Sequence, residues 1–462
     1  DSVMNALFAL DVTPGMGIVV VRDTQIVYMK GFGYADIEAK RPFTPQTEFY
    51  IASTTKSFTG LATALLDKKG TFKLDAPLHQ YLPALKLQAP MDADSITIRS
   101  LLTHTHGIGG GPVAIRLAYS GEYKDDAELL RLLEMHTAAK SGRAYSYTNL
   151  GYNVATLAMD KVTKKFWKDV LAQEIFTPLG MKNTSAYVSK FKREDLATPY
   201  GITLAGWTAR PYGKTDANMQ SAGGLITTLR DMGTWLEANI NNGRLNGRQV
   251  LPASAFEEAH KNYVQLATNV RGGKQIGYGL GWEIFTFGND TVLIHGGGFP
   301  GFATSMSFIP SRHIGVAVFA NNDWIGGGFV DVAAQEAYRV LTDGMFPAYP
   351  MEQIPVLVTR LRGQIKSELE KRAARSQVLP FPLDAYAGTY ENPAMGHLRI
   401  EVVNGKLEAK FGAAWSPIEV YDATKNQLRI ELFGQGEIVN VEMKNGKAAS
   451  LSFGGNEYRR TD

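Results

Sequence analysis

A serine and a lysine one helical turn apart form the first group in this sequence that could do chemistry. Ser53 and Lys56 open a segment whose apolar residues have helical spacing, so both side chains are expected on one face of the helix. A serine hydroxyl becomes a good nucleophile when a base takes its proton, and a lysine can be that base where burial or a neighbouring charge lowers its pKa. We therefore predict Ser53 as a nucleophile and Lys56 as its partner, in the positive potential of a helix N-terminus.

The surroundings of Ser53 distinguish it from a second copy of the same spacing. Ser189 and Lys192 also stand three residues apart, but their stretch is charged and has no apolar periodicity, which is typical of a solvated loop. Ser53 instead lies between the largely apolar stretches 49–52 and 57–61. A lysine in such a setting needs a functional reason.

A tyrosine and an asparagine two residues apart form the second group. Tyr147 and Asn149 precede a segment with helical spacing from Leu150 onward, and in an extended segment residues two apart point the same way. The phenol can relay protons and the carboxamide can hold a substrate carbonyl. The same spacing recurs at Tyr390 and Asn392 in the β-rich tail, where a turn is the simpler interpretation.

A histidine followed by three glycines forms the third group. His295 ends a predicted strand at 291–295, and the next three residues, 296–298, are glycines. Glycines on a strand allow a ligand to approach the backbone closely. The backbone N–H groups of Gly298 and Ser53 are therefore predicted to form an oxyanion hole.

Composition and missing motifs exclude several classes of function. The chain of 462 residues has no cysteine, which excludes thiol catalysis, disulfides and iron–sulfur clusters. Lys plus Arg is 48 and Asp plus Glu is 45, and a net charge of +3 gives no electrostatic case for nucleic acid or an anionic membrane. No apolar run approaches the roughly 18 residues of a membrane span. His104 and His106 lack a nearby acidic residue, so two loop histidines are favoured over a metal site.

The cell compartment is weakly indicated. The sequence begins at Asp1 rather than at Met, which is compatible with removal of a signal peptide or of a disordered start. We expect a periplasmic or secreted location, although a large core without disulfides is equally compatible with the cytoplasm.

The order of predicted elements over residues 1–350 favours an α+β fold. A hairpin is predicted at 16–34 and strands at 291–295, 304–309 and 315–320, with helices between them and a further helix at 330–341. Two of the intervening helices are expected at 222–236 and 253–260. Strands that open and close the region predict an antiparallel sheet flanked by helices, with an all-helical lobe from the middle of the chain.

The C-terminal quarter predicts a separate small barrel. Residues 343–352 have the composition of a boundary, and 353–375 read as one charged helix that prolines stop at 380 and 382. Short strands then recur from Tyr386 onward, and Asn-Gly pairs at 404–405 and 445–446 predict hairpin turns. We expect a first domain at 1–350, a helical linker at 351–382 and an antiparallel β-barrel at 383–462.

The three groups, in this order, resemble the penicillin-recognising serine enzymes. These comprise class C β-lactamases, serine D-Ala-D-Ala carboxypeptidases, D-aminopeptidases and family VIII esterases. The resemblance covers about residues 10–345, and the tail is similar to the lipocalin-like domain of some peptidases of this group. Further stretches that look like the family lie at Leu101–Thr105, Ser221–Leu225, Tyr278–Trp282, Pro300–Phe302 and, in the tail, Tyr386–Tyr390.

Two positions depart from the common pattern of that superfamily. Most β-lactamases carry lysine in the third motif, whereas this chain has His295, which is similar to certain carboxypeptidases, D-aminopeptidases and esterases. This departure lowers the expectation of efficient β-lactam hydrolysis. His106 stands where many relatives have serine, and the sequence offers no account of it beyond a local loop substitution.

The resemblance implies a serine hydrolase that works through an acyl-enzyme without metal or cofactor. Lys56 and Tyr147 would share the acid and base roles, Asn149 would orient the acyl side, and His295 would bind a substrate carboxylate or assist Tyr147. We expect a peptidase or amidase for short peptides, including those with D-residues, and a homo-oligomer by analogy. A promiscuous esterase, a β-lactam or muropeptide sensor that is acylated without turnover, and an inactive homologue remain the alternatives.

Overall fold

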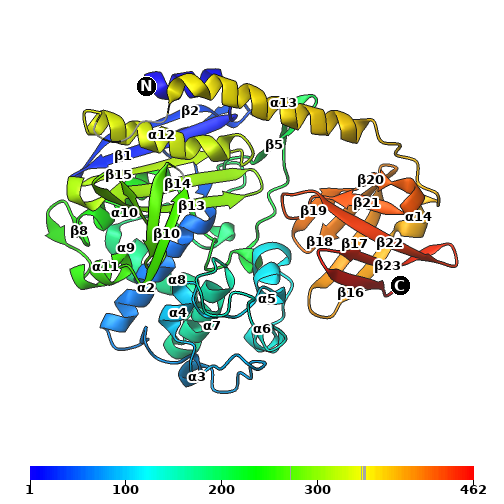
Figure 1. Ribbon diagram of the computed structural model, residues 1–462, viewed down its shortest axis with the longest axis horizontal. Helices are drawn as coiled ribbons and strands as arrows, with labels where there is room; N and C mark the ends of the chain where they lie inside the picture. The colour runs from blue at the N-terminus through cyan, green and yellow to red at the C-terminus, as the bar shows by residue number, and fades with distance from the viewer. Residues whose placement is uncertain (271, 345, 347–349) are drawn as a thin grey trace.

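A nine-stranded antiparallel sheet forms the centre of the N-terminal part of the computed structural model, which describes residues 1–270, 272–344, 346 and 350–462 (Figure 1). The strand order is β10-β11-β12-β13-β14-β15-β1-β2-β3, so the chain enters and leaves this part through neighbouring strands. The predicted antiparallel sheet that joins both ends of the region is confirmed. The strands are β1 (Gly15–Arg22), β2 (Gln25–Asp36), β3 (Arg41–Pro42), β10 (Val264–Val270), β11 (Gly273–Tyr278), β12 (Glu283–Phe287), β13 (Asp290–Phe299), β14 (Phe302–Ile309) and β15 (Ile314–Ala320).

Helices cover both faces of the sheet, which explains why the neighbouring strands β1 and β15 are apolar over almost their whole length. In β1, Ile18 and Val20 pack in the core shared with α1 (Ser2–Ala9) and α12 (Gly326–Leu341), whereas Val19 and Val21 pack in the core shared with α2 (Thr55–Lys68), α10 (Leu229–Ile240) and α11 (Ala253–His260). Side chains that alternate along a strand must both be apolar when both faces are buried.

A helical lobe lies below the sheet in Figure 1 and comes from the middle of the chain. Its helices pack around α7, whose residues 150–159 are all buried. The lobe confirms the predicted all-helical part of the fold. Its helices are α3 (Leu78–Tyr81), α4 (Ile98–Leu102), α5 (Pro112–Ile115), α6 (Asp126–Leu133), α7 (Leu150–Thr163) and α8 (Trp167–Leu171), while α9 (Thr177–Leu179) contacts α10 beside the sheet.

Short strand pairs connect the lobe to the sheet, and one of them corrects a sequence prediction. A helix was expected at 222–236, but α10 begins only at Leu229, after the Thr228 side chain accepts a hydrogen bond from the Asp231 N–H. The preceding residues pair as β7 with β4 instead. The short pairs are β4 (Phe49–Tyr50) with β7 (Ile226–Thr227), β5 (Tyr200–Thr203) with β6 (Gly206–Ala209), and β8 (Arg244–Leu245) with β9 (Arg248–Gln249).

The C-terminal region forms a nearly closed antiparallel barrel, reached through the long helix α13 (Ile354–Ala373) (Figure 1). Asn404 and Asn445, each followed by glycine at positive φ, make the two predicted hairpin turns. Apolar side chains from strands around the barrel fill its interior. Its elements are α14 (Leu383–Tyr386), β16 (Gly388–Asn392), β17 (Gly396–Val403), β18 (Lys406–Phe411), β19 (Ala414–Pro417), β20 (Glu419–Asp422), β21 (Gln427–Ile430), β22 (Glu437–Lys444), β23 (Lys447–Phe453) and β24 (Asn456–Arg460).

Two predictions about the start of this region need comment. A strand was expected from Tyr386, but this residue ends the short helix α14, and its hydroxyl donates to the Asn426 side chain at 2.9 Å. Residues 345 and 347–349 of the predicted boundary at 343–352 lie outside the described residues. The division into domains at 350 and 382 therefore stays a prediction.

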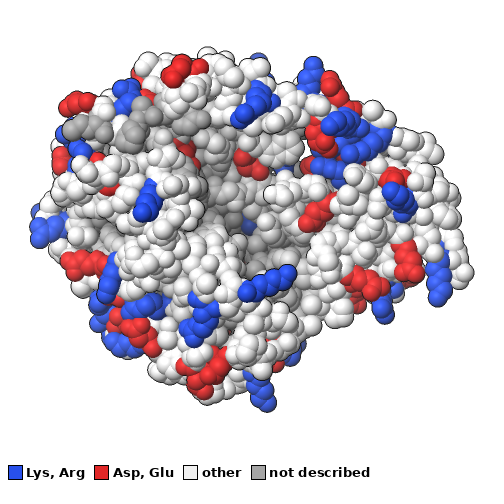
Figure 2. Space-filling model, viewed as in Figure 1, with Lys and Arg blue, Asp and Glu red and all other residues white. Residues whose placement is uncertain are grey.

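One buried and one partly buried arginine connect the barrel to the rest of the chain. Arg116 of the lobe, 6% exposed, donates to the carbonyl oxygens of Pro393 and Ala394 at 3.2 and 2.8 Å. Arg372 of α13 forms ion pairs with Glu419 at 2.5 Å and Glu431 at 3.1 Å. A hollow remains between the barrel and the rest of the molecule, and acidic and basic side chains are mixed over this face (Figure 2). Among the described residues, no helix has both the length and the apolar character needed to cross a membrane.

Candidate active site

Ser53 lies in a single turn of 3-10 helix, η1 (Ala52–Thr54), between β4 and α2. The preceding residue, Ala52, is buried and has a left-handed backbone with φ of +46°. A non-glycine residue pays about 1 kcal/mol or more for that conformation, and such strain is found where a side chain must be presented. The turn directs Ser53 into a cavity of about 650 Å³, while the first three turns of α2 are buried.

Lys56 lies in the first turn of α2, and three oxygens surround its amino group. Its Nζ lies 3.0 Å from the Ser53 Oγ, 2.8 Å from the Asn149 Oδ1 and 2.8 Å from the Ala222 carbonyl oxygen. The side chain is fully buried. The structure thus places Ser53 and Lys56 together, as their spacing predicted, and brings Asn149 to the same amine, as the family resemblance implied. The structure adds the Ala222 carbonyl oxygen to this group. Ala222 belongs to the stretch Ser221–Leu225, which resembles the family but was given no role from the sequence.

Burial lowers the pKa of Lys56 well below its ordinary value of 10.5, and the charge of Glu283 only partly opposes this effect. A neutral amine has two N–H donors and one lone pair. The two carbonyl-type oxygens of Asn149 and Ala222 accept both donors. The lone pair then faces the Ser53 hydroxyl, which is the arrangement that a general base requires.

Tyr147 and Asn149 come from the irregular segment that leads into α7. Asn149 adopts helical backbone angles at the helix start, so the segment is not the extended chain that the sequence suggested. Both side chains nevertheless meet Lys56, because its Nζ lies 4.8 Å from the centre of the Tyr147 ring. Tyr147 is 43% exposed and lines the cavity that holds Ser53.

Strand β13 forms the opposite wall of the cavity. The strand was expected to end at His295 but continues through the three glycines that follow. These glycines pair in register with β14, in which Ala303 lies opposite Gly298. At Gly297 a Cβ atom would lie 2.3 Å from the Ile51 carbonyl oxygen, so only glycine allows β13 to pack this closely on the turn of Ser53. Gly298 is exposed and lines the same cavity as Ser53, as predicted for two parts of one oxyanion hole.

His295 lies behind this wall rather than in the cavity. It is 1% exposed, its Nε2 lies 3.2 Å from the Tyr278 hydroxyl, and its ring centre is 6.0 Å from that of Tyr147. Its burial favours an electrostatic influence on Tyr147 over direct binding of a substrate carboxylate. Tyr278 was found only as part of a family-like stretch.

His106 has a structural explanation that the sequence did not provide. It is 3% exposed, and its Nδ1 accepts a hydrogen bond from the Ile108 N–H at 3.0 Å. Burial lowers its pKa to about 4, which keeps the ring neutral. A serine hydroxyl can accept the same kind of backbone bond, so the histidine closes the loop in another way.

Several side chains of the cavity were not identified from the sequence. They reach Ser53 from four separate stretches of the chain, and no spacing within the sequence links them. Only the topology of the sheet and α12 brings them together. They are Tyr145, Gln275, Glu283, Asp323 and Asp331.

Comparison with known proteins identifies the family. The family model for beta-lactamase matches residues 4–333, which is more than half of the chain. The chain belongs to the beta-lactamase family.

Curated relatives of this beta-lactamase-family chain are distant in sequence. Protein flp of Staphylococcus aureus (strain MW2) is 26% identical over 313 residues, which cover 67% of this chain and 59% of that protein. This chain therefore spans less than two thirds of the length of that relative. Unguisins hydrolase ungD' of Aspergillus campestris (strain IBT 28561) is 26% identical over 411 residues, covering 84% of this chain and 74% of that protein.

Solved structures confirm the fold over the whole chain. The octameric penicillin-binding protein homologue from Pyrococcus abyssi superposes with a TM-score of 0.64 and 23% identity over 99% of this chain and 98% of that one. The D-amino acid amidase from Ochrobactrum anthropi SV3 superposes with a TM-score of 0.59 and 22% identity over 73% of this chain and 100% of that one. At such identities the likeness is one of fold.

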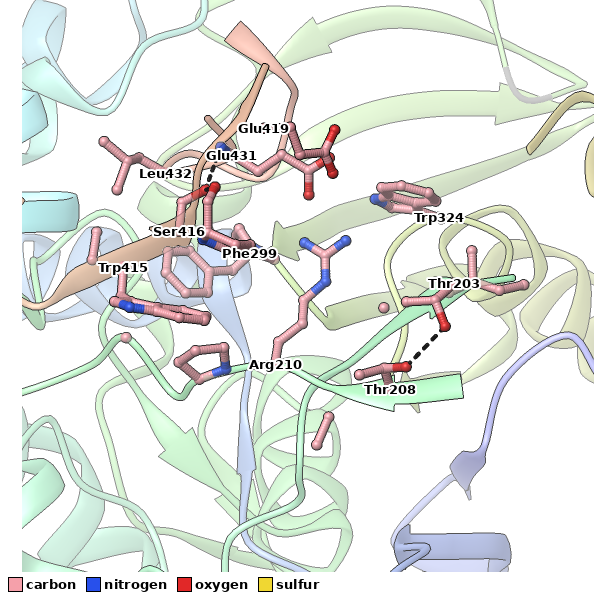
Figure 3. Close-up of a pocket in the computed structure, with 18 of the residues that line it drawn as sticks. Thr203, Thr208, Arg210, Phe299, Trp324, Trp415, Ser416, Glu419, Glu431 and Leu432 are labelled. Atoms are coloured by element: carbon pink, nitrogen blue, oxygen red, sulfur yellow. Dashed lines mark hydrogen bonds between the residues drawn. The ribbon is translucent and has the colours of Figure 1, made fainter. Parts of the chain in front are cut away.

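A second cavity, of about 340 Å³, lies between the beta-lactamase-family part and the barrel. Figure 3 shows Arg210 directed into it between Trp415 and Trp324, with Glu419 and Glu431 on the barrel side. Ser53 is not among its lining residues. Phe299 and Pro300, which follow the glycines of β13, form part of its wall, so the barrel borders the turn next to the active-site strand.

Lys214 supports the same turn from inside the protein. Its side chain is 4% exposed, its Nζ donates to the Ala118 carbonyl oxygen at 2.7 Å, and it lies 3.9 Å from the centre of the Phe299 ring. Burial lowers the pKa of Lys214 from 10.5 to about 7. The unfolded chain therefore binds more protons than the folded chain between pH 7 and 10.5, and stability contributed by this residue rises with pH across that interval.

Replacing Lys214 by methionine should remove this rise of the free energy of unfolding with pH. Because the pKa falls from 10.5 to about 7, wild type should gain on the order of 5 kcal/mol relative to Lys214→Met between pH 7 and 10.5, with the variant the more stable at pH 7. Urea unfolding at steps of one pH unit measures this difference. Lys192→Met, which removes an exposed lysine, is the control. Equal pH slopes in Lys214→Met and wild type would contradict the prediction.

Proposed function

We propose that this protein is an amidase or peptidase that cleaves short peptides, including those with D-residues, through an acyl-enzyme on Ser53. The arrangement of Lys56 carries the proposal. The Lys56 amine is buried, and carbonyl-type oxygens accept both of its N–H donors. Its nitrogen lies 3.0 Å from the Ser53 Oγ, so its lone pair can take the proton of that hydroxyl.

The reaction follows from this geometry. As the Ser53 Oγ bonds to the substrate carbonyl carbon, its proton passes to Lys56, and the backbone N–H groups of Ser53 and Gly298 receive the oxyanion. Collapse of the tetrahedral intermediate breaks the C–N bond, and the leaving amine takes a proton from the Lys56–Tyr147 pair. A water molecule then attacks the ester carbonyl carbon and gives a proton to the same pair. Cleavage of the bond between that carbon and the Ser53 Oγ releases the acid, and the pair returns the proton to the Oγ.

The relatives support amide rather than ester substrates. The Ochrobactrum anthropi structure is named a D-amino acid amidase, and the Aspergillus campestris relative is named a hydrolase of unguisins. The Pyrococcus abyssi homologue is described as octameric, which supports the expectation of a homo-oligomer. Light scattering on the full chain would measure the assembly.

Turnover of matched D- and L-alanyl p-nitroanilides tests the proposal, with p-nitrophenyl acetate as the ester and Ser53→Ala as the blank. We expect Ser53-dependent release of p-nitroaniline with a preference for the D-substrate. Cleavage of the ester alone would favour an esterase. A stable acyl adduct without product release, seen by intact-protein mass, would favour a sensor. Absence of all three would overturn the proposal.

A further inference from the structure

His104 is a buried histidine in contact with the candidate proton relay, and the reaction described above gives it no role. It follows α4 in the loop 103–106, is 1% exposed, and has a left-handed backbone with φ of +61°. Its ring centre lies 4.6 Å from that of Tyr147 and 4.7 Å from that of Tyr278. A bulky side chain held at positive φ inside the protein indicates a constraint imposed by its surroundings.

His104 holds the chain on both sides of Tyr147. Its carbonyl oxygen accepts the Ser146 N–H at 3.0 Å, and its ring Nδ1 accepts the Thr148 N–H at 3.3 Å. Tyr147 itself lies in an irregular segment with no helix or strand to fix it. One residue therefore fixes the backbone before and after the tyrosine and packs against its ring.

Hydrogen bonds and close packing hold the loop 103–106, which carries His104, against the neighbouring helices. The Thr105 N–H donates to the Ser100 carbonyl oxygen at 2.9 Å, and the Tyr152 hydroxyl donates to the Leu102 carbonyl oxygen at 2.9 Å. At Gly151 a Cβ atom would lie 2.1 Å from the Leu101 carbonyl oxygen, so α4 and α7 pack in backbone contact. The loop that carries His104 is thus fixed to the two helices on which Tyr147 and Asn149 depend.

Packing alone does not explain a histidine here. Because Nδ1 accepts from an N–H, the ring proton of the neutral form is on Nε2, which is buried without a hydrogen-bond partner among the described residues. A buried donor without a partner costs about 1–3 kcal/mol, which phenylalanine or leucine would avoid. Burial holds the pKa of His104 well below 6.5, so Nδ1 stays an acceptor.

We propose that His104 is the positioning residue of Tyr147, fixing the phenol over Lys56 through the Nδ1 hydrogen bond to the Thr148 N–H. The inference rests on the proposed function, because it gives Tyr147 its role in the proton relay. His104 touches neither Ser53 nor the substrate cavity and acts through the tyrosine alone.

Two variants separate the acceptor from the ring. His104→Phe keeps an aromatic ring without the acceptor, and His104→Asn keeps an acceptor at the δ1 position and tolerates positive φ. We expect His104→Phe to lower kcat for the best anilide or ester substrate about 10- to 100-fold with little change in KM, since small displacements of a catalytic group cost that much. His104→Asn should recover most of the loss, and thermal unfolding shows whether each variant is folded.

A double-mutant cycle tests whether the effect passes through Tyr147. Tyr147→Phe removes the hydroxyl and keeps the ring, so His104→Phe should cause no further loss of kcat in that background. Hydrogen exchange of a peptide covering 144–150 should become faster in His104→Phe and stay slow in His104→Asn. Additive losses, equal losses in both variants, or unchanged exchange would overturn the inference. If wild type shows no Ser53-dependent turnover, the proposed function fails, and the exchange measurement still decides the positioning.

Discussion

Replacing Ser53 by alanine should lower kcat by at least about 10⁴-fold, whichever ester or amide proves to be the substrate. The change removes the Ser53 Oγ. Among the described residues, this is the only oxygen that lies 3.0 Å from the Lys56 amine and also lines the cavity that holds Ser53. Loss of a serine nucleophile has effects of this size in other hydrolases. Substrate binding should persist, because the glycines of β13 and Asn149 stay in place. Steady-state kinetics and the intact mass of trapped acyl-enzyme measure both consequences.

The chain offers its own control for this variant. Ser189 and Lys192 repeat the Ser-x-x-Lys spacing, but Ser189 lies in an exposed turn and its hydroxyl donates to Asp216 at 2.6 Å. Ser189→Ala should leave kcat unchanged within a factor of two. An acyl group trapped on Ser189, or substantial activity in Ser53→Ala, would show that the nucleophile had been assigned to the wrong serine.

Local signals in the sequence predicted the sheet and the barrel, and they selected residues that the structure brings together around Lys56. The apolar run of β1 required two covered faces, and the Asn-Gly pairs fixed two barrel hairpins because asparagine and glycine accept positive φ. The three motifs lie on separate elements, namely the turn before α2, the segment that leads into α7 and strand β13, so it was the family resemblance that predicted their convergence. Ser53, Lys56 and Asn149 meet within hydrogen-bonding distance as expected.

The features that could not be predicted depend on contacts between distant stretches. The start of α10 is set by the pairing of β7 with β4. In this pair Phe49 lies opposite Thr227 and Tyr50 opposite Ile226, at separations of 178 and 176 residues in the chain. The burial of His295 depends on Tyr278, and the acidic wall of the cavity depends on Glu283 and Asp331, which share no local pattern with Ser53. Tertiary burial, rather than residue type, decides which histidine or carboxylate faces the substrate.

Replacing Lys56 by methionine should separate catalysis from stability. Methionine has a similar volume and no base, so kcat should fall by about 10³-fold or more. In wild type, burial lowers the pKa of Lys56 well below 10.5, so the folded protein holds a proton on this amine less tightly than the unfolded chain does, and this difference costs stability below pH 10.5. The variant avoids this cost and loses the hydrogen bonds to Asn149 and Ala222, each of which contributes about 1 kcal/mol.

The balance of these effects favours the inactive variant. We expect the free energy of unfolding of Lys56→Met to exceed that of wild type at pH 7, and the difference to shrink toward pH 10, where the unfolded lysine is also becoming neutral. Denaturant unfolding at pH 7 and pH 10, beside the kinetics, measures both effects, with Lys192→Met as the control for an exposed lysine. If Lys56→Met were inactive and also less stable at pH 7, the lysine would support the fold as an ammonium ion, and it could not be the base that activates Ser53. A gain in stability on loss of activity would mean that the protein maintains a costly neutral amine because the proton transfer from Ser53 requires it.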